Sequence, residues 1–360
     1  MSTKTIAVVD HAHGEPLAVE EVELPDPGPL EVRVKLFATG ICHSQLHQIH
    51  NPASPRPQLL GHEATGVVEA AGRQVTHVRE GDRVMVTWVP RDATEETWAF
   101  TRARATARGV EAKMTSVFTW AQDVLCHEQM VVKLDDDLPV DSTAIIGCAV
   151  VTGVGAVLGS AKVQEGETVA VFGVGGVGIN VLAGAKIAGA SKVIAVDLAP
   201  EKLEFAKKFG ATHVVDGRES DPVEAIRDLT GGGPLAGVDY AFDAIGMESV
   251  INQCLGSVRP GLLGVHRGGT AVSVGIPQGP VTLQPRFFPA GERSLIGSLG
   301  GSARPEYDFK DYLRWYRDGL LPLDEMVTRR YDSLDDINEI VGTLERGEVT
   351  GRAIVEFGAR

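Results

Sequence analysis

Three short segments in the first 150 residues carry side chains that can bind a metal ion or move a proton: residues 40–47 (GICHSQLH), 61–63 (GHE) and 147–148 (GC). Cys42, His62 and Cys148 could supply two thiolates and an imidazole to zinc, leaving a fourth position for water or substrate. Two thiolates neutralise the charge of the ion, and such a centre can still lower the pKa of a bound hydroxyl, which suits alcohol oxidation. Isolated Cys and His are more often core or surface residues, so spacing alone leaves that alternative open.

A second candidate site lies in residues 168–197, where a short apolar, β-branched run is followed by GVGGVG and then by helical apolar spacing. Gly173 permits a tight turn, Gly175 lets the backbone approach a pyrophosphate, and Gly178 lets helix pack on strand. The next strand ends at Asp197, 19 residues after Gly178, where this fold places an acid for the adenosine ribose. A glycine turn without a ligand is the alternative for an isolated motif, but the flanking strands and the acid favour NAD binding, and NAD over NADP.

Whole-chain properties limit the remaining possibilities. A length of 360 residues predicts about two domains, and 43% hydrophobic residues suffice for real cores. Because apolar runs are short and the N-terminus lacks a signal pattern, we expect a soluble, cytoplasmic protein. The net charge of −14 argues against nucleic acid or an anionic membrane as partner. The four cysteines (42, 126, 148 and 254) form no CxxC pair, so metal binding or core packing remains for them.

The elements that must position these groups fall into two kinds. Residues 1–90 and 117–133 hold short β-type runs separated by Gly, Pro or Asp turns, whereas residues 91–115 suggest a surface helix or loop. From residue 168 strand and helix alternate, which predicts a parallel sheet covered by helices on both faces. Its six expected strands are 168–172, 192–196, 213–215, 238–242, 271–274 and 295–297. The rest, with expected helices at 309–317 and 334–346 and a strand at 352–357, is too small to stand alone and should return to the first unit.

Several motifs together carry a family resemblance: GICHSQLH at 40–47, GHE at 61–63, IGC at 146–148, VFGVGGVG at 171–178, FDAIG at 242–246, SVGIP at 273–277 and GRAIVEF at 351–357. Over nearly its full length the chain resembles the zinc-dependent alcohol dehydrogenases of the medium-chain dehydrogenase/reductase family. The resemblance implies an α/β protein in which a Rossmann doubly wound parallel sheet is inserted in a β-rich GroES-like catalytic domain. The implied boundaries are 1–150 and 300–360 for the catalytic domain and 151–299 for the NAD-binding domain.

The resemblance also assigns roles to residues. Cys42, His62 and Cys148 match the catalytic zinc ligands, Glu63 matches a carboxylate behind the metal, and Ser44 would accept the alcohol proton and pass it through the cofactor ribose to His47. Residues matching cofactor contacts are His43, Thr152, Gly173, Gly175, Gly176, Val177, Gly178, Asp197, Lys202, Val274 and Arg352. Trp88, Phe118 and Trp120 fall where the family lines its substrate pocket, although aromatic residues are as often part of a core.

Three positions depart from the family pattern. Residues 91–115 contain no cysteine, so we expect one catalytic zinc per chain and no structural zinc. Gln45 replaces the usual aspartate that orients the ligand histidine, which should weaken that support. His43 stands where an arginine often contacts pyrophosphate.

The implied function is reversible, NAD-dependent oxidation of an alcohol to an aldehyde or ketone. The alternatives are a polyol or other secondary-alcohol dehydrogenase of the same superfamily, or a non-catalytic nucleotide-binding relative, and metal content would separate catalyst from binder. The expected partners are a small-molecule alcohol or aldehyde and, through the Rossmann domains, further copies of the chain in a homodimer or homotetramer.

Overall fold

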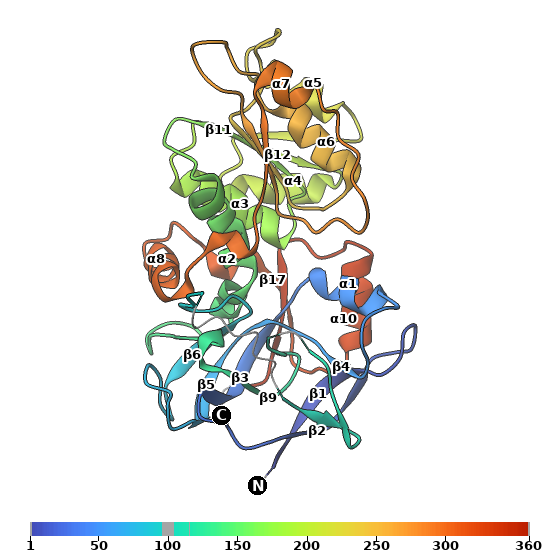
Figure 1. Cartoon of the computed structure of the whole chain (residues 1–360), viewed down its shortest axis with the longest axis vertical. Helices are drawn as coiled ribbons and strands as arrows, with labels where there is room; N and C mark the ends of the chain where they lie inside the picture. Colours follow the sequence, from blue (N-terminus) through green and yellow to red (C-terminus); the bar gives the residue numbers. More distant parts are fainter. Residues whose placement is uncertain (1, 96–103, 115, 359–360) are drawn as a thin grey trace. The chain divides into compact units, whose positions relative to one another are not determined.

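The computed structural model describes residues 2–95, 104–114 and 116–358, and the chain divides into two compact units (Figure 1). The first unit comprises Met1–Cys148, Arg304–Tyr316 and Leu323–Arg360; the second comprises Ala149–Ala303 and Arg317–Pro322. Arg317–Pro322 thus groups with the second unit, although the sequence predicted an uninterrupted return to the first from residue 300. None of the helices in the described part of the chain is long and apolar enough to span a bilayer.

The second unit is built on one parallel sheet, as predicted. Its strand order is β13-β12-β11-β14-β15-β16, and all five pairings are parallel. The strands are β11 (Thr168–Phe172), β12 (Lys192–Asp197), β13 (His213–Asp216), β14 (Tyr240–Asp243), β15 (Thr270–Ser273) and β16 (Ser294–Gly297). The chain runs outwards from β11 to β13 and then returns to β14 on the other side of β11. This reversal makes the carboxyl ends of β11 and β14 the switch point where such sheets bind ligands.

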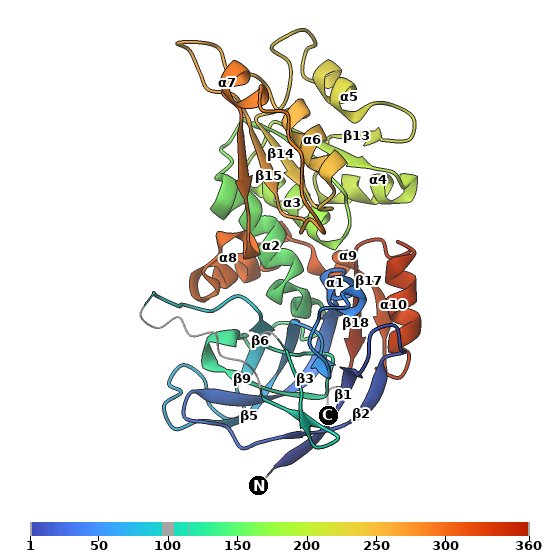
Figure 2. The same cartoon turned by 45° about the vertical axis from the view of Figure 1, so that its right-hand side comes forward.

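Helices cover both faces of this sheet, because right-handed crossovers on either side of β11 place their helices on opposite faces. The helices of the second unit are α2 (Ala149–Gly155), η3 (Ala156–Ala161), α3 (Gly176–Ile187), α4 (Pro200–Ala206), η4 (Lys207–Phe209), α5 (Pro222–Leu229), α6 (Glu248–Ser257), α7 (Phe287–Gly291) and η5 (Gly300–Ser302). Figure 2 shows α6 beside β14 and β15, and Phe172 and Ile194 pack there against Ile226 of α5 and Cys254 of α6. The start of α5 follows from its sequence: Asp221 caps the first turn by accepting the N–H groups of Val223 and Glu224, and proline follows at the first helical position.

The first unit consists of two antiparallel-rich sheets with short helices. One sheet has the order β4-β1-β2-β7-β8; the other has the order β10-β6-β5-β3-β18-β17, with β9 also paired to β3. The strands are β1 (Thr3–Asp10), β2 (Ala18–Leu24), β3 (Glu31–Ile41), β4 (Gln58–Leu59), β5 (Glu63–Ala71), β6 (Arg83–Thr87), β7 (Thr106–Ala107), β8 (Val110–Glu111), β9 (Asp123–His127), β10 (Val131–Lys133), β17 (Val327–Tyr331) and β18 (Arg352–Glu356). The helices are α1 (Ser44–His50), η1 (Glu128–Met130), η2 (Ser142–Gly147), α8 (Pro305–Arg317), α9 (Leu323–Met326) and α10 (Ile337–Glu345).

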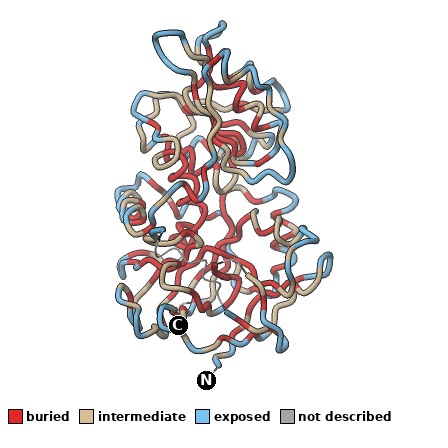
Figure 3. The backbone as a smooth tube through the Cα atoms, in the orientation of Figure 1, coloured by how far each residue is buried: buried red, intermediate tan, exposed pale blue. Residues whose placement is uncertain are grey.

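Alternation along β3 explains how this unit forms its core. Val32, Val34 and Leu36 are buried, whereas Lys35 between them is exposed, as a half-buried strand requires. Figure 3 shows the buried backbone following the strands in each unit and the exposed backbone following the connecting loops. The final strand β18 joins this sheet beside β3, with Ala353 opposite Ile41. Strand β18, near the C-terminal end of the chain, therefore belongs to the same sheet as β3, near its N-terminal end.

The segment expected to be a surface helix or loop forms a small hairpin instead. Strands β7 and β8 pair with each other, and β7 extends the first sheet through β2. Two arginines fix the hairpin, because Arg104 donates to both carboxylate oxygens of Glu31 and Arg108 donates twice to Glu20. The prediction for residues 96–103 and 115 lies outside the described residues.

Candidate metal and cofactor sites

Three loops of the first unit bring the predicted metal ligands together. Cys42 follows β3 directly, His62 precedes β5, and Cys148 follows η2. Their ligand atoms all lie within 4.8 Å of one another, and all three residues are buried. The two sulfurs are 3.8 Å apart, and His62 Nε2 lies 3.1 Å from Cys148 Sγ. Within the described residues this is the one group of three or more His, Cys, Asp or Glu side chains arranged to hold a metal.

The spacing fits zinc. A tetrahedral ion with Zn–S bonds of about 2.3 Å and a Zn–N bond of about 2.0–2.1 Å separates two sulfurs by roughly 3.8 Å and sulfur from nitrogen by roughly 3.6 Å. The sulfur pair already has that separation, and the imidazole is within about half an ångström of it. Cys126 and Cys254, by contrast, are packed in the cores of the first and second unit. Cys42 and Cys148 therefore belong to the candidate metal site, whereas Cys126 and Cys254 are core residues.

Close backbone approach makes this cluster possible. A Cβ atom on Gly40 would lie 2.2 Å from the Glu63 carboxylate, and one on Gly147 would lie 2.2 Å from the Val86 carbonyl oxygen. Any larger side chain at either position would push apart the loops that carry Cys42 and Cys148. The glycines of the GIC and GC motifs are thus part of the geometry of the site.

The ionisable groups at the cluster include the two thiols and, behind them, a buried ion pair. The contact with Cys148, together with Arg352 and His62, lowers the pKa of Cys42 well below its usual value, and the same contact and burial raise the pKa of Cys148. Behind them Arg352 donates Nε–H to Glu63 Oε1 at 2.8 Å, and neither side chain is more than 5% exposed. Burial raises the pKa of Glu63, and Arg352 opposes that rise. Sequence reasoning placed Arg352 on the pyrophosphate and missed this pairing; the cofactor contact stays a prediction.

Helix α1 carries the residues assigned to proton transfer. Ser44 Oγ donates to Cys42 Sγ at 3.1 Å, and the rings of His43 and His47 meet edge to face with centroids 6.1 Å apart. Burial lowers the pKa of His47; the Cys42 thiolate opposes this effect, and His50 adds to it.

A buried clamp holds the end of this helix. Arg56 donates Nε–H to both oxygens of Asp10 at 3.0 Å and NH2 to the Ile49 carbonyl at 2.8 Å, while Gln58 donates to Asp10 at 2.6 Å and to the Gln48 carbonyl at 3.3 Å. The last carbonyls of α1 are thereby satisfied. The sequence analysis did not single out this clamp, because its members look like ordinary loop residues.

The three aromatic residues assigned to a substrate pocket differ in how deeply they are buried. Phe118 and Trp120 are 0% exposed and belong to the hydrophobic clusters of the first unit, and Trp120 Nε1 donates to the Gly40 carbonyl at 3.2 Å. These two take the core alternative left open by the sequence. Trp88 is partly buried, and its indole N–H has no acceptor among the described residues. Trp88 also packs against the cluster that contains Phe118, so its place in a substrate pocket stays a prediction.

The glycine turn of the second unit follows β11 and opens α3, as predicted. Gly173 has φ +85°, and a Cβ on Gly178 would lie 1.9 Å from the Gly173 carbonyl oxygen. A Cβ on Gly175 would meet nothing within 4 Å, so open space faces this position. Gly176 and Val177 begin α3, whose first N–H groups have no partner within the helix. The turn has the shape and the donors that a pyrophosphate requires.

Asp197 ends β12 and ties this strand to the turn. Its Oδ2 accepts the Val174 N–H at 2.9 Å, and its Oδ1 accepts the N–H groups of Leu198 and Ala199 at 2.7 and 3.0 Å. Its carboxylate therefore serves a structural purpose besides the predicted ribose contact. Lys202 lies on α4, two residues inside the helix, and is partly exposed.

The buried side-chain oxygens of the second unit that lack partners among the described residues include one of Thr152 and one of Asp243. Thr152 Oγ1 on α2 has none, which leaves it available for the predicted cofactor contact. Asp243 ends β14, and its Oδ1 accepts the N–H groups of Ile245 and Gly246 at 2.9 Å while Oδ2 is unpaired. The Asp243 carbonyl accepts the N–H of Val274 at 2.9 Å. Asp243 was not among the predicted site residues. Its position at a strand end within the FDAIG motif could have indicated a side chain that stabilises the following loop.

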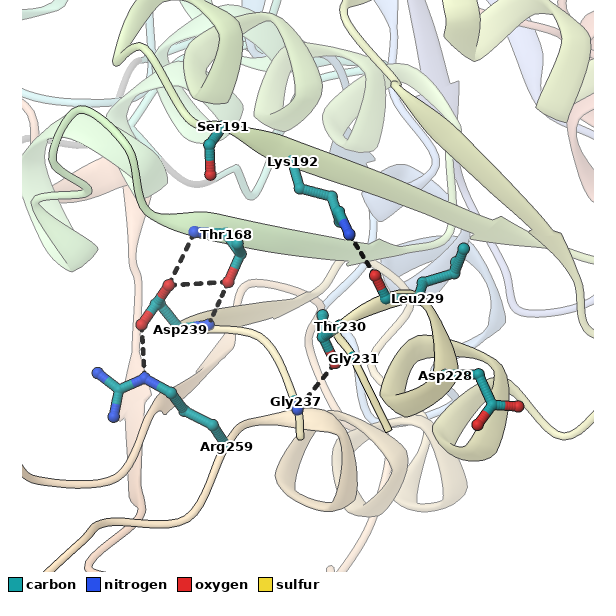
Figure 4. A pocket seen from close by; sticks show the side chains of 10 residues that line it. All are labelled: Thr168, Ser191, Lys192, Asp228, Leu229, Thr230, Gly231, Gly237, Asp239 and Arg259. Atoms are coloured by element: carbon teal, nitrogen blue, oxygen red, sulfur yellow. Dashed lines mark hydrogen bonds and ion pairs between the residues drawn. The ribbon is translucent and has the colours of Figure 1, made fainter. Parts of the chain in front are cut away.

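A cavity of about 710 Å³ opens at the end of the same sheet where its central strands begin (Figure 4). Thr168 and Lys192, the first residues of β11 and β12, line it. Its polar groups bind one another: Asp239 accepts the Arg259 Nε–H at 2.6 Å and the Thr168 hydroxyl at 2.8 Å. Since open parallel sheets bind ligands at the carboxyl ends of their strands, this cavity is not the cofactor site.

Comparison with known proteins finds matches along nearly the whole chain. Residues 28–136 match the family model described as alcohol dehydrogenase GroES-like domain, and residues 176–318 match the model described as zinc-binding dehydrogenase. The chain is 35% identical to the NDMA-dependent alcohol dehydrogenase of Amycolatopsis methanolica, with 96% of this chain and 97% of that protein covered. It is 34% identical to an alcohol dehydrogenase class-3 of Cereibacter sphaeroides, with 98% and 100% covered.

Among solved structures, benzyl alcohol dehydrogenase from Acinetobacter calcoaceticus aligns with a TM-score of 0.85 and 28% identity, over 99% of this chain and 100% of that one. A zinc-binding domain protein from Burkholderia ambifaria, described as an alcohol dehydrogenase, aligns with a TM-score of 0.87 and 28% identity over 100% of both chains. A structure from Sinorhizobium meliloti 1021 that aligns with a TM-score of 0.77 and 25% identity, over 98% of this chain and 99% of that one, is bound to NADP.

Proposed function

The chain belongs to the zinc-dependent alcohol dehydrogenases of the medium-chain dehydrogenase/reductase family, and from that premise we propose that it oxidises an alcohol to an aldehyde or ketone with NAD, reversibly, using one zinc per chain. The observation that carries the proposal is the buried Cys42–His62–Cys148 cluster with zinc-like spacing. When bound there, zinc would supply a Lewis acid for the substrate oxygen, and NAD would supply the hydride acceptor.

The chain's own residues would do the rest. Ser44, which already donates to a ligand sulfur, takes the alcohol proton, and His47 on the same helix releases it towards solvent. The glycine turn and the start of α3 hold pyrophosphate, Asp197 and Lys202 hold the ribose, and Thr152, Val177 and Val274 orient the nicotinamide. His43 and Arg352 are the further contacts proposed for the phosphates, and Trp88 contacts the substrate.

The direct test follows NADH formation with the zinc-analysed protein over primary, secondary, aromatic and polyol alcohols. Activity with an alcohol and one zinc per chain supports the proposal; no activity on any substrate would favour a nucleotide-binding protein without catalysis. Because one relative is named as NDMA-dependent, the panel should be repeated with NDMA added.

We expect Asp197 to set the preference for NAD over NADP. A 2′-phosphate would face its carboxylate and forfeit a charged hydrogen bond of about 1.5–3 kcal/mol, so Asp197→Ala should lower the NAD/NADP ratio of kcat/KM by about 10- to 150-fold. Asp197→Asn is the matched control, because its amide can still accept from the Val174 N–H and so separates lost charge from a loosened turn. An unchanged ratio in a folded Asp197→Ala protein would refute the assignment.

His47 gives a prediction about pH. Burial lowers its pKa from the usual ~6.5, so the neutral, proton-accepting form persists to lower pH. Alcohol oxidation should therefore hold its rate as pH falls to about 6.5 and decline only below that value. His47→Gln should slow oxidation by about tenfold or more at pH 7, a smaller loss than for a residue that contacts the substrate, and imidazole buffer should restore part of the rate. His127→Gln serves as control, because His127 is another partly buried histidine of the first unit whose pKa burial also lowers. Equal pH profiles for wild type and His47→Gln would remove His47 from the relay.

A further inference from the structure

The side-chain amide of Gln45 contacts one backbone group and one side chain. The residue is 2% exposed and lies on α1, between the loop of Cys42 and the loop of His62. Its Oε1 accepts the Gly61 N–H at 2.7 Å, and its Nε2 lies 2.6 Å from His62 Nδ1. Both neighbours precede or belong to the imidazole ligand of the metal cluster, so the amide bears directly on how that ligand is protonated.

The protonation that a metal requires is the opposite of the one this amide favours. His62 points Nε2 at Cys148 Sγ, so Nε2 is the nitrogen directed into the metal cluster. A neutral imidazole that binds metal through Nε2 carries its proton on Nδ1 and needs an acceptor there. Nε2 of Gln45 is a donor, and it favours the tautomer of His62 whose proton is on the cluster side.

Rotating the amide does not remove the conflict. With oxygen and nitrogen exchanged, the oxygen would accept from His62 Nδ1–H, but the amide NH2 would then face the buried Gly61 N–H, so two donors would meet. When His62 carries its proton on Nδ1, as metal binding requires, either orientation of the amide leaves one donor facing another donor. A buried donor without an acceptor is costly. A carboxylate of the same length would place one oxygen on each donor.

We propose that Gln45 is a positioning residue that holds the zinc affinity of this site below the level its three ligands could reach, by opposing the Nδ1–H tautomer of His62. The inference rests on the proposed metal site and adds a property to it: zinc is held more weakly, and exchanges more readily, than a carboxylate at position 45 would allow. The substitution Gln45→Glu keeps the length of the side chain, changes the donor into an acceptor and adds one negative charge.

The experiment measures zinc dissociation constants by chelator competition for wild type, Gln45→Glu and Gln48→Glu. Gln48 lies on the same helix and is partly exposed, so its substitution adds the same charge without facing His62. We expect Gln45→Glu to bind zinc about 10- to 100-fold more tightly, the usual range for a group that supports a ligand histidine, and Gln48→Glu to bind within about twofold of wild type. Thermal unfolding and NADH binding confirm folding, and Gln45→Asp replaces Gln45→Glu should that variant not fold.

A second readout is independent of affinity. In ¹⁵N NMR spectra recorded after chelator treatment, His62 of wild type should carry its proton on Nε2, and His62 of Gln45→Glu should carry it on Nδ1. Equal zinc affinities for wild type and folded Gln45→Glu, or the same tautomer in both, would overturn the role of Gln45. If neither protein binds zinc, the proposed metal site itself fails and the inference fails with it.

Discussion

A Cys148→Ala protein is expected to lose zinc and hydride transfer while it keeps NADH binding. Cys148 supplies one of three protein ligands, whereas the glycine turn and Asp197 belong to the second unit and bind phosphate and adenosine. Without the ion the substrate oxygen is neither held nor acidified, and a metal Lewis acid contributes several kcal/mol, so we expect kcat/KM to fall by roughly 10³-fold or more. Elemental analysis and NADH fluorescence titration measure the two properties on one sample.

Cys126→Ala provides the matched control, because Cys126 is equally buried in the first unit, and burial raises its thiol pKa without a metal neighbour. It should retain zinc and activity. A folded Cys148→Ala enzyme with full activity would end the zinc mechanism, and two zinc ions in wild type would contradict the missing structural lobe.

The second large effect concerns stability. Arg352→Met removes the buried partner of Glu63 and leaves a carboxylate that is 0% exposed, a loss that typically costs about 3–5 kcal/mol in the free energy of unfolding. Burial already raises the pKa of Glu63, and removing Arg352 raises it further. An acid whose pKa is raised on folding destabilises the fold most where it must ionise, so the loss should be larger at pH 8 than at pH 5.5.

Urea unfolding followed by tryptophan fluorescence measures this, because Trp88, Trp120 and Trp315 lie in described segments of the first unit. The double variant Arg352→Met with Glu63→Gln removes both charges and should recover most of the stability. If the single and double variants unfold at the same urea concentration at both pH values, the ion pair is not a significant source of stability.

The parts of the fold set by local pattern could be predicted from the sequence. All six strands of the second unit appear within a few residues of the expected ranges, because buried parallel strands are apolar throughout and are bounded by glycine turns. The glycine turn was predicted for the same reason, because a short motif with fixed spacing carries its own geometry. The metal trio has no such spacing, since Cys42 and Cys148 are 106 residues apart, and the family resemblance assigned it.

Relations between distant segments could not be predicted. Glu63 and Arg352 are 289 residues apart, and no local pattern pairs them. Phe118 and Trp120 have the composition of either a pocket wall or a core, and only tertiary packing decides between the two. The hairpin at residues 106–111 could not be predicted, because each of its strands is two residues long and β7 depends on pairing with the distant β2.

The pairing of β18 with β3 has a consequence for synthesis on the ribosome. All three metal ligands have been translated by residue 148, but the arginine that neutralises Glu63 beside them follows 289 residues after that glutamate. At about 5–20 residues per second, translation from residue 148 to residue 352 takes roughly 10–40 s. During it the nascent chain has its thiols and a carboxylate in a sheet that lacks its closing strand. The metal ligands are therefore expected to reach their final surroundings only after Arg352 has been translated, well after the ligands themselves.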